Sequence, residues 1–329
     1  MEYRDLGKSG MKVSTIAFGA WAVGGTMWGG SDDNDAITAI QHSLDLGITT
    51  IDTAPAYGNG ASERIVGKAI KGRRDQVQIL TKFGLQINTG VGTLHLQLTD
   101  LDGQPLRLYK NAKKDIIIAE CEQSLKNLNT DYIDVYQQHW PDPATPLDET
   151  FEAVEQLLKA GKIRAIGVSN YSCDQLDVAG KMASITSIQP PYSMVNRGIE
   201  KELLPYCITN DIGVVVYSPL QRGLLTGKIG MDTQFPATDH RSQFPSFKPE
   251  NRQKVLGLLD RIKPIAESHR ITLAQLAIAW TIAQKGISTA LVGARNPQQA
   301  KENARAAAVK LTSSELEWID AHSKKIILQ

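Results

Sequence analysis

Four side chains that could together move a proton lie near the ends of three successive predicted strands: Asp52, Tyr57, Lys82 and His139. A phenol has an ordinary pKa of about 10 and donates its proton poorly at pH 7. The ammonium of Lys82 would favour the phenolate, lower the pKa of Tyr57 and make it a better acid. Asp52 would orient Lys82, while His139 would hydrogen-bond the substrate oxygen or relay the proton. The set therefore predicts proton delivery to a carbonyl group.

Each of these residues also has a purely structural explanation. Tyr57 could be an ordinary loop tyrosine, and Lys82 could be a surface lysine. Asp52 could cap a turn or pair with a base, and His139 beside Trp140 could be a packed histidine. Because all four fall at matching ends of adjacent strands, we favour the catalytic interpretation.

Strand and helix patterns alternate eight times along the chain, which predicts a parallel sheet. The strands are expected at residues 13–19, 48–52, 77–82, 132–138, 164–168, 186–189, 213–217 and 288–292. Helices are expected between them, with extra helices near 250–269, 273–285 and 314–323. Eight such units favour an α/β fold, the (β/α)8 TIM barrel, in which active sites lie at the C-terminal ends of the strands.

The rival architecture, a doubly wound Rossmann sheet, requires the spacing GxGxxG after the first strand. The sequence there is Gly19-Ala20-Trp21-Ala22-Val23-Gly24-Gly25, which lacks that spacing. Residues 3–13 predict an N-terminal β-hairpin that closes the bottom of the barrel. No linker is visible, so the prediction is a single domain over residues 1–329.

Two long segments interrupt the alternation of strands and helices. Residues 83–113 show no clear period and leave the third strand on the active-site side, so they could cover the pocket or form a mobile insertion. Residues 221–249 carry Phe235, Phe244 and Phe247 and are interpreted as a cover for cofactor or substrate, with inert packing as the alternative.

The composition is ordinary for a globular protein, with 42% hydrophobic and 22% charged residues and a formal net charge of +1. This charge gives no reason to expect a nucleic acid or membrane partner. Neither a signal peptide nor a long apolar run is visible, and Cys121, Cys173 and Cys207 are far apart, which together favour the cytoplasm. The histidines are scattered, so no metal is expected. Nothing in the sequence indicates an oligomeric state.

Several motifs occur in a fixed order: Ile51-Asp52-Thr53-Ala54-Pro55-Ala56-Tyr57-Gly58, then Leu80-Thr81-Lys82, the segment ending in His139-Trp140-Pro141, and Gly161 to Asn170. With them the chain resembles the aldo-keto reductase family, and most nearly its bacterial reductases near the potassium-channel beta subunits. The resemblance implies that Asp52, Tyr57, Lys82 and His139 form a catalytic tetrad. It further implies NADPH-dependent reduction of an aldehyde or ketone, with Tyr57 as the general acid.

The same resemblance implies a set of cofactor contacts. Ser169, Asn170 and Gln189 would hold the nicotinamide carboxamide, and Tyr217 would stack on its ring. The pyrophosphate would contact Ser218, Leu220, Arg222 and Gly223, and the adenosine Arg295, Gln299, Glu302 and Asn303. Further expected contacts are Gly19, Ala20, Trp21, Asp52, Pro219, Gly293 and Ala294. Because Gln299 stands where many family members have a basic residue, Arg295 is expected to contact the 2′-phosphate.

The substrate is expected to be a small carbonyl compound in a pocket lined by Trp21, Trp28, Tyr57, His139 and Trp140. One alternative is a regulatory or redox-sensing module that binds nicotinamide and turns over slowly. Another is a non-redox barrel, which would need a metal site or a carboxylate pair at the strand ends. The intact set of four residues favours the reductase.

Overall fold

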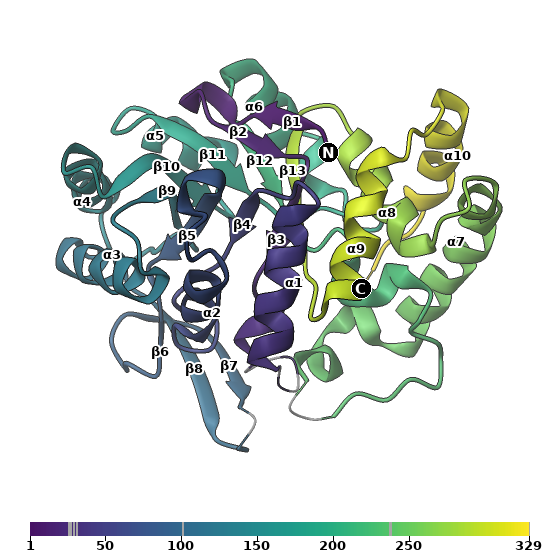
Figure 1. Cartoon of the computed structure of the whole chain (residues 1–329), viewed down its shortest axis with the longest axis horizontal. Coiled ribbons are helices and arrows are strands. Elements are labelled where there is room, and N and C mark those ends of the chain that lie inside the picture. The colour runs from purple at the N-terminus through teal and green to yellow at the C-terminus, as the bar shows by residue number, and fades with distance from the viewer. Residues whose placement is uncertain (26–27, 29, 31, 101, 237–238, 329) are drawn as a thin grey trace.

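The expected strands close into one parallel barrel (Figure 1). This computed structural model describes residues 1–25, 28, 30, 32–100, 102–236 and 239–328. The barrel strands, in the order of the chain, are β3 (Ile16–Gly19), β4 (Thr50–Asp52), β5 (Gln78–Phe83), β9 (Ile133–Gln138), β10 (Ile163–Ser169), β11 (Ile185–Gln189), β12 (Gly213–Val216) and β13 (Ile287–Val292). The prediction of a (β/α)8 barrel is therefore confirmed.

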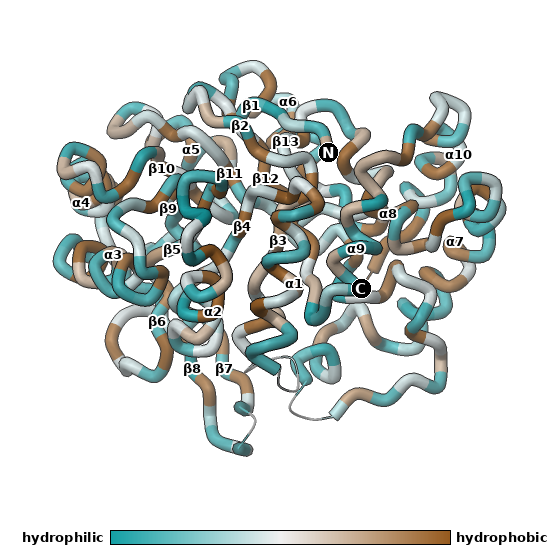
Figure 2. Tube along the Cα trace, viewed as in Figure 1, coloured by the Kyte–Doolittle hydropathy of each residue, from teal (hydrophilic) through white to brown (hydrophobic). Residues whose placement is uncertain are grey.

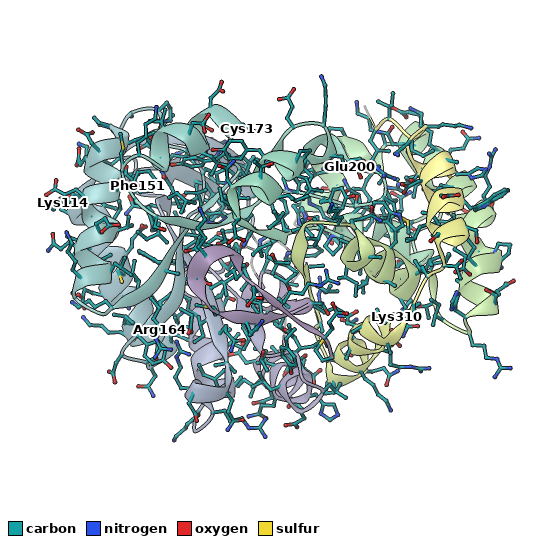
Figure 3. The ribbon with its side chains drawn as sticks, turned by 90° about the horizontal axis from the view of Figure 1, so that it is seen from above. Lys114, Phe151, Arg164, Cys173, Glu200 and Lys310 are labelled. Carbon is teal, nitrogen blue, oxygen red and sulfur yellow. The ribbon has the colours of Figure 1, made fainter. Side chains whose placement is uncertain are left out.

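Helices surround the barrel and bury their apolar sides against its outer face. They are α1 (Asp33–Asp45), α2 (Ala61–Ala69), α3 (Lys114–Leu128), α4 (Leu147–Lys159), α5 (Cys173–Ala179), α6 (Leu203–Asn210), α7 (Pro249–Ser268), α8 (Leu273–Ala283), α9 (Pro297–Arg305) and α10 (Ser313–Ser323). Hydrophobic residues gather in the central strands, and hydrophilic residues recur along the helices (Figure 2). Phe151 of α4 is buried, whereas Lys114, labelled at the left edge of Figure 3, is partly exposed and Lys310 is exposed. Within the described residues, no helix is long and apolar enough to cross a membrane.

The N-terminal hairpin consists of β1 (Tyr3–Asp5) and β2 (Lys12–Ser14), which pair in antiparallel fashion. The predicted first strand, 13–19, was therefore too long, because Val13 and Ser14 pair with β1 instead of extending β3. Leu6 and Val13 are buried among barrel-interior residues, so the hairpin closes the N-terminal end as expected.

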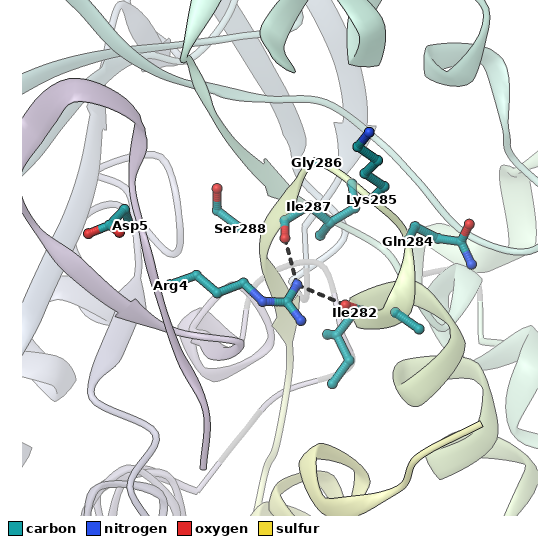
Figure 4. Close-up of a pocket in the computed structure, with 9 residues that line it drawn as sticks. Arg4, Asp5, Ile282, Gln284, Lys285, Gly286, Ile287 and Ser288 are labelled. Atoms are coloured by element: carbon teal, nitrogen blue, oxygen red, sulfur yellow. Dashed lines mark hydrogen bonds between the residues drawn. The ribbon is translucent and has the colours of Figure 1, made fainter. Parts of the chain in front are cut away.

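A pocket beside this hairpin is lined by the side chain of Arg4 (Figure 4). Its Nη1 donates hydrogen bonds to the carbonyl oxygens of Ile282, at 2.8 Å, and Ile287, at 2.7 Å. These carbonyls lie at the end of α8 and the start of β13. The pocket thus belongs to the N-terminal end of the barrel, opposite the predicted site, and the guanidinium joins the hairpin to it.

The long segment after β5 is not the structureless loop that its missing period predicted. It forms an antiparallel sheet of β6 (Leu85–Ile87), β8 (Pro105–Lys110) and β7 (Thr93–Thr99), in that order, at the bottom of Figure 1. We call this the insertion sheet. One of its faces packs against the barrel end, as described below. The hydrophobic alternation of Leu94, Leu96 and Leu98 was a strand signal that the prediction missed.

The second long segment contains short 3-10 turns at Gln221–Thr226, His240–Gln243 and Pro245–Phe247 before α7 begins. Asp239 forms an isolated antiparallel bridge with Trp28, which follows β3. Two segments that are far apart in sequence therefore meet at the C-terminal end of the barrel.

Candidate active site

A buried ion pair is the centre of the site. Nζ of Lys82, on β5, lies 2.6 Å from Oδ1 of Asp52, on β4, and both side chains are almost fully buried. The same Nζ donates a hydrogen bond to the hydroxyl oxygen of Tyr57 at 3.2 Å and to the carbonyl oxygen of Thr53 at 2.9 Å. Adjacent parallel strands end side by side, which brings the two charges together.

The other carboxylate oxygen of Asp52 also has partners. Oδ2 accepts hydrogen bonds from Nε2 of Gln189, at 2.8 Å, and Nε2 of Gln137, at 3.3 Å. Gln137 was not among the predicted site residues, although it lies two positions before His139 on an inward-facing strand. Both amides satisfy a charge that would otherwise be costly to bury.

His139 completes the group of four. Its ring centroid is 5.7 Å from that of Tyr57, edge to face. Burial, and then the charge of Lys82 and that of His95 in its protonated form, lower the pKa of His139 well below its ordinary value. The imidazole is therefore neutral at pH 7 and can serve as a hydrogen-bond donor or acceptor without carrying charge.

The pKa of Tyr57 departs from the prediction. The sequence predicted a lowered pKa through Lys82, but burial and then the negative charge of Asp52 raise the pKa of Tyr57 well above its ordinary value. Desolvation penalises the phenolate more than the ammonium stabilises it, because Asp52 already neutralises that ammonium. The phenol consequently keeps its proton at neutral pH. Burial also lowers the pKa of Lys82.

The residues predicted to hold a nicotinamide form one hydrogen-bonded group beside the tetrad. Nδ2 of Asn170 donates to Oγ of Ser169, at 3.0 Å, and to the carbonyl oxygen of His139, at 3.1 Å. The hydroxyl of Tyr217 donates to Oδ1 of Asn170 at 2.9 Å, and Oγ of Ser169 donates to the carbonyl oxygen of Gln189 at 2.7 Å. Asn170 has a φ of 62°, a left-handed conformation that asparagine tolerates.

The segment after Tyr217 is suited to an anion. Ser218, Gln221, Arg222 and Gly223 all have positive φ, so the backbone turns sharply there, and Pro219 is buried. The Arg222 guanidinium is largely buried over the Phe244 ring, 3.9 Å from its centroid. Among the described residues, its Nε has no hydrogen-bond partner. Burial lowers the pKa of Arg222, a cost that a bound phosphate would offset.

The predicted adenosine residues cluster after β13. The backbone N–H of Arg295 donates to Oε1 of Gln299 at 2.8 Å, and Nδ2 of Asn303 donates to the carbonyl oxygen of Gly293 at 3.0 Å. The carbonyl oxygen of Glu302 accepts from Nε2 of Gln275 on α8. Ala294 and Ala20 are both buried. Gly19 ends β3, the strand paired with β13, and lies beside Gly293, while the N–H of Ala20 donates to the carbonyl oxygen of Asp52 at 2.8 Å.

An aromatic cluster borders the site. Trp21 and Trp28 meet edge to face with ring centroids 5.1 Å apart, and His240 contacts both rings. Trp21 also approaches Tyr57, with centroids 6.2 Å apart. Nη2 of Arg295 donates to the carbonyl oxygen of Trp28 at 3.0 Å. Four of the five predicted pocket residues thus lie in one chain of ring contacts from Trp28 to His139.

Trp140, the fifth, lies on the other side of the tetrad and contacts His95 of the insertion sheet, with ring centroids 4.5 Å apart. His95 was not among the predicted site residues, whereas His240 and Arg241 belong to the segment 221–249 that was interpreted as a cover for cofactor or substrate. Within the described residues, no group of three His, Cys, Asp or Glu side chains could hold a metal ion.

Several known proteins are similar to this chain in sequence and in fold. The model of the "Aldo/keto reductase family" matches residues 15–324. The chain is similar to "Aldo-keto reductase YhdN" of Bacillus subtilis (strain 168), with 44% identity over 91% of this chain and 86% of that protein. It is 37% identical to "NADH-specific methylglyoxal reductase" of Escherichia coli (strain K12), over 96% of each chain.

A plant relative is the "Probable voltage-gated potassium channel subunit beta" of Arabidopsis thaliana, 34% identical over 93% of this chain and 91% of that protein. Among solved structures, the glycerol dehydrogenase AKR11B4 from Gluconobacter oxydans superposes with a TM-score of 0.86 and 38% identity, over 97% of this chain and 94% of that one. The predicted resemblance is confirmed by these matches: the chain belongs to the aldo/keto reductase family.

Proposed function

We propose that this chain reduces an aldehyde or ketone to an alcohol with NADPH, and that Tyr57 protonates the carbonyl oxygen. Membership of the family already makes the chain an oxidoreductase that uses a nicotinamide cofactor on small carbonyl compounds. The observation that carries the finer proposal is the continuous chain of contacts from Asp52 through Lys82 to the Tyr57 hydroxyl.

The residues fit a dinucleotide. The buried Arg222 guanidinium, whose Nε lacks a partner among the described residues, would bind the pyrophosphate. Ser169, Asn170 and Gln189 would hold the carboxamide, and the Tyr217 ring would lie against the nicotinamide. When bound, the nicotinamide would supply a hydride to the carbonyl carbon.

Proton delivery follows from the chain's own groups. Tyr57 holds its proton at neutral pH because burial raises its pKa, so the phenol is available as a donor. As negative charge develops on the carbonyl oxygen, the O–H bond of Tyr57 breaks and the proton moves to that oxygen. The Lys82 ammonium, 3.2 Å from the same hydroxyl, stabilises the phenolate that forms. Neutral His139 would hydrogen-bond the substrate oxygen and fix its orientation.

The preference for NADPH rests on a pair of cations at the adenosine end. Arg241 and Arg295 both lie against the Trp28 ring, with guanidinium carbons 5.3 Å and 5.6 Å from its centroid. Burial, and then the charge of Arg241, lower the pKa of Arg295. Asp239 neutralises Arg241 through a bidentate pair. A 2′-phosphate beside Arg295 would relieve the remaining charge. The Escherichia coli relative is named as NADH-specific, so this preference is proposed for this chain alone.

The first test replaces the proton donor. Tyr57→Phe removes the hydroxyl and keeps the ring, so we expect kcat with NADPH and simple aldehydes to fall about 100-fold or more. Cofactor affinity, measured by fluorescence titration, should stay within about twofold. Unchanged turnover in this variant would refute the role of Tyr57. Tight cofactor binding by the unaltered protein without turnover of any carbonyl would favour a sensing module instead.

The second test concerns the cofactor. Arg295→Ala should raise the Kd for NADPH about tenfold or more, because a charge-assisted contact is lost, and change the Kd for NADH little. Both values come from the same fluorescence titration. Equal losses for the two cofactors would mean that Arg295 does not recognise the 2′-phosphate.

A further inference from the structure

The insertion sheet packs directly on the loops that carry the tetrad. Leu85 and Leu108 are buried with Ala56, the residue before Tyr57. Ile87, Leu96 and Trp140, the residue after His139, pack against the same cluster. The sheet is therefore a wall of the candidate site and not a separate appendage.

A β-bulge aims one polar side chain of this sheet at the site. In the pairing of β7 with β8, Leu94 is opposite Tyr109 and Leu96 is opposite Leu108, so His95 is an extra residue without a partner position. Bulges locally change the direction of a side chain and are common beside active sites. Here the bulge puts both His95 and Leu96 on the packed side of β7, whereas Leu94 is 52% exposed.

His95 meets the tetrad through Trp140. The His95 and Trp140 ring centroids are 4.5 Å apart, and the charge of His95 in its protonated form is among the causes that lower the pKa of His139. Burial and then Lys110 lower the pKa of His95 itself, so the half-buried ring is neutral at pH 7. Among the described residues, no group forms a hydrogen bond with either ring nitrogen of His95. A neutral imidazole with uncommitted nitrogens can both donate to and accept from an oxygen.

We infer that His95 is a specificity-determining residue, which hydrogen-bonds a hydroxyl or second carbonyl oxygen on the part of the substrate beyond the reacting carbonyl. This inference rests on the proposed reductase function. It assigns as preferred substrates aldehydes and ketones that carry a further oxygen, because the polar ring of His95 lies against Trp140, beside the hydrophobic cluster of Ala56, Leu85 and Leu108. A site built to hydrogen-bond a substrate oxygen discriminates strongly against an analogue that lacks it.

The test uses two aldehydes of equal chain length, glyceraldehyde and propanal. His95→Ala should lower kcat/KM for glyceraldehyde about tenfold and leave that for propanal within about twofold. His95→Gln, whose amide can also donate and accept, should recover part of the loss. Leu94→Ala, on the exposed side of the same strand, is the matched control and should leave both values unchanged. Equal losses for the two aldehydes in His95→Ala would overturn the inference.

A second measurement does not depend on turnover. The chain has six histidines, so the imidazole Cε1–H signal of His95 can be assigned in an NMR spectrum by its absence from His95→Ala. With NADPH present, glycerol should shift this signal and 1-propanol should not. Equal shifts or no shift would overturn the inference. Failure of the proposed function would appear separately, as no reduction of either aldehyde by the unaltered protein, and the glycerol titration would still decide the role of His95.

Discussion

Burying the ion pair of Lys82 and Asp52 carries a desolvation penalty in folding free energy, because two charges are removed from water. The surroundings offset this cost with hydrogen bonds: Thr53 accepts from Lys82, and Gln137 and Gln189 donate to Asp52. A structure that needed stability alone would gain as much from apolar residues in these positions. We therefore interpret the pair as retained for its effect on the neighbouring Tyr57 hydroxyl.

Replacing the lysine tests this view. Lys82→Met leaves the Asp52 carboxylate buried without its counter-charge, so we expect the free energy of unfolding to fall by about 3–5 kcal/mol and kcat by about 100-fold or more. Urea unfolding and steady-state kinetics measure the two effects. Lys12→Met breaks the exposed pair with Asp5 and is the control, with an expected change within about 1 kcal/mol. A fully stable Lys82→Met variant would show that Asp52 needs no counter-charge.

The positions of the four residues could be predicted from the sequence, but the pKa direction of Tyr57 could not. Strand ends can be recognised from a hydrophobic pattern, and parallel strands bring their ends together whatever the loops do. The pKa depends on burial and on how far Asp52 already compensates Lys82, and both are properties of the packed site. Gln137 was overlooked because its hydrogen bond to Asp52 likewise depends on how the side chains pack inside the barrel.

At the scale of elements, the barrel and its hairpin were predictable, whereas the insertion sheet was not. Each barrel strand is a short apolar run followed by a helix pattern. This pattern is visible locally in the sequence, and its repetition along the chain indicates a parallel α/β fold. The three strands within 83–113 are amphipathic and become stable only by packing on Ala56 and Trp140, which are distant in sequence. The bulge at His95 shifts the pairing of β7, so the regular alternation of Leu94, Leu96 and Leu98 in the sequence does not reveal that Leu94 is exposed.

Glu120 of α3 anchors the start of this sheet, because its Oε2 accepts the backbone N–H of Gly84 at 2.7 Å. Burial raises the pKa of Glu120 to about 7. The folded state therefore holds this proton more tightly than the unfolded state, and the stability it contributes is lost as the pH rises through 7. Glu120→Gln keeps the acceptor but cannot ionise. We expect the Tm of this variant, relative to the unaltered protein, to rise from pH 5 to pH 8.

Differential scanning fluorimetry at pH 5, 6, 7 and 8 measures this difference. Subtracting the two proteins at each pH removes the contribution of groups that they share, such as the histidines. A Tm difference that does not change with pH would mean that Glu120 is ionised in the folded state throughout this range, against the raised pKa.

At the scale of the whole molecule, the two ends of the barrel have different tasks. The C-terminal end gathers the tetrad, the predicted cofactor residues and the insertion sheet, whereas the N-terminal end is closed by the hairpin. Gly7, with a φ of 50°, lies so close to Gly213 and Thr186 that a Cβ there would meet backbone atoms within 2.8 Å. The hairpin therefore fits closely against the N-terminal end of the barrel. We expect substitutions in the hairpin to change the stability of the fold without changing catalysis at the opposite end.

Leu6→Ala tests this separation. The Leu6 side chain is fully buried beside Val13 and barrel-interior residues, so its truncation should lower the free energy of unfolding by about 2–5 kcal/mol. Leu46→Ala, at a 39% exposed position, is the control and should change it little. Because the altered side chain lies at the opposite end from Tyr57, kcat measured well below the Tm should stay within about twofold. A large fall in kcat in the folded Leu6→Ala protein would mean that the barrel interior couples its two ends, and the hairpin would then belong to the catalytic apparatus as well as to the fold.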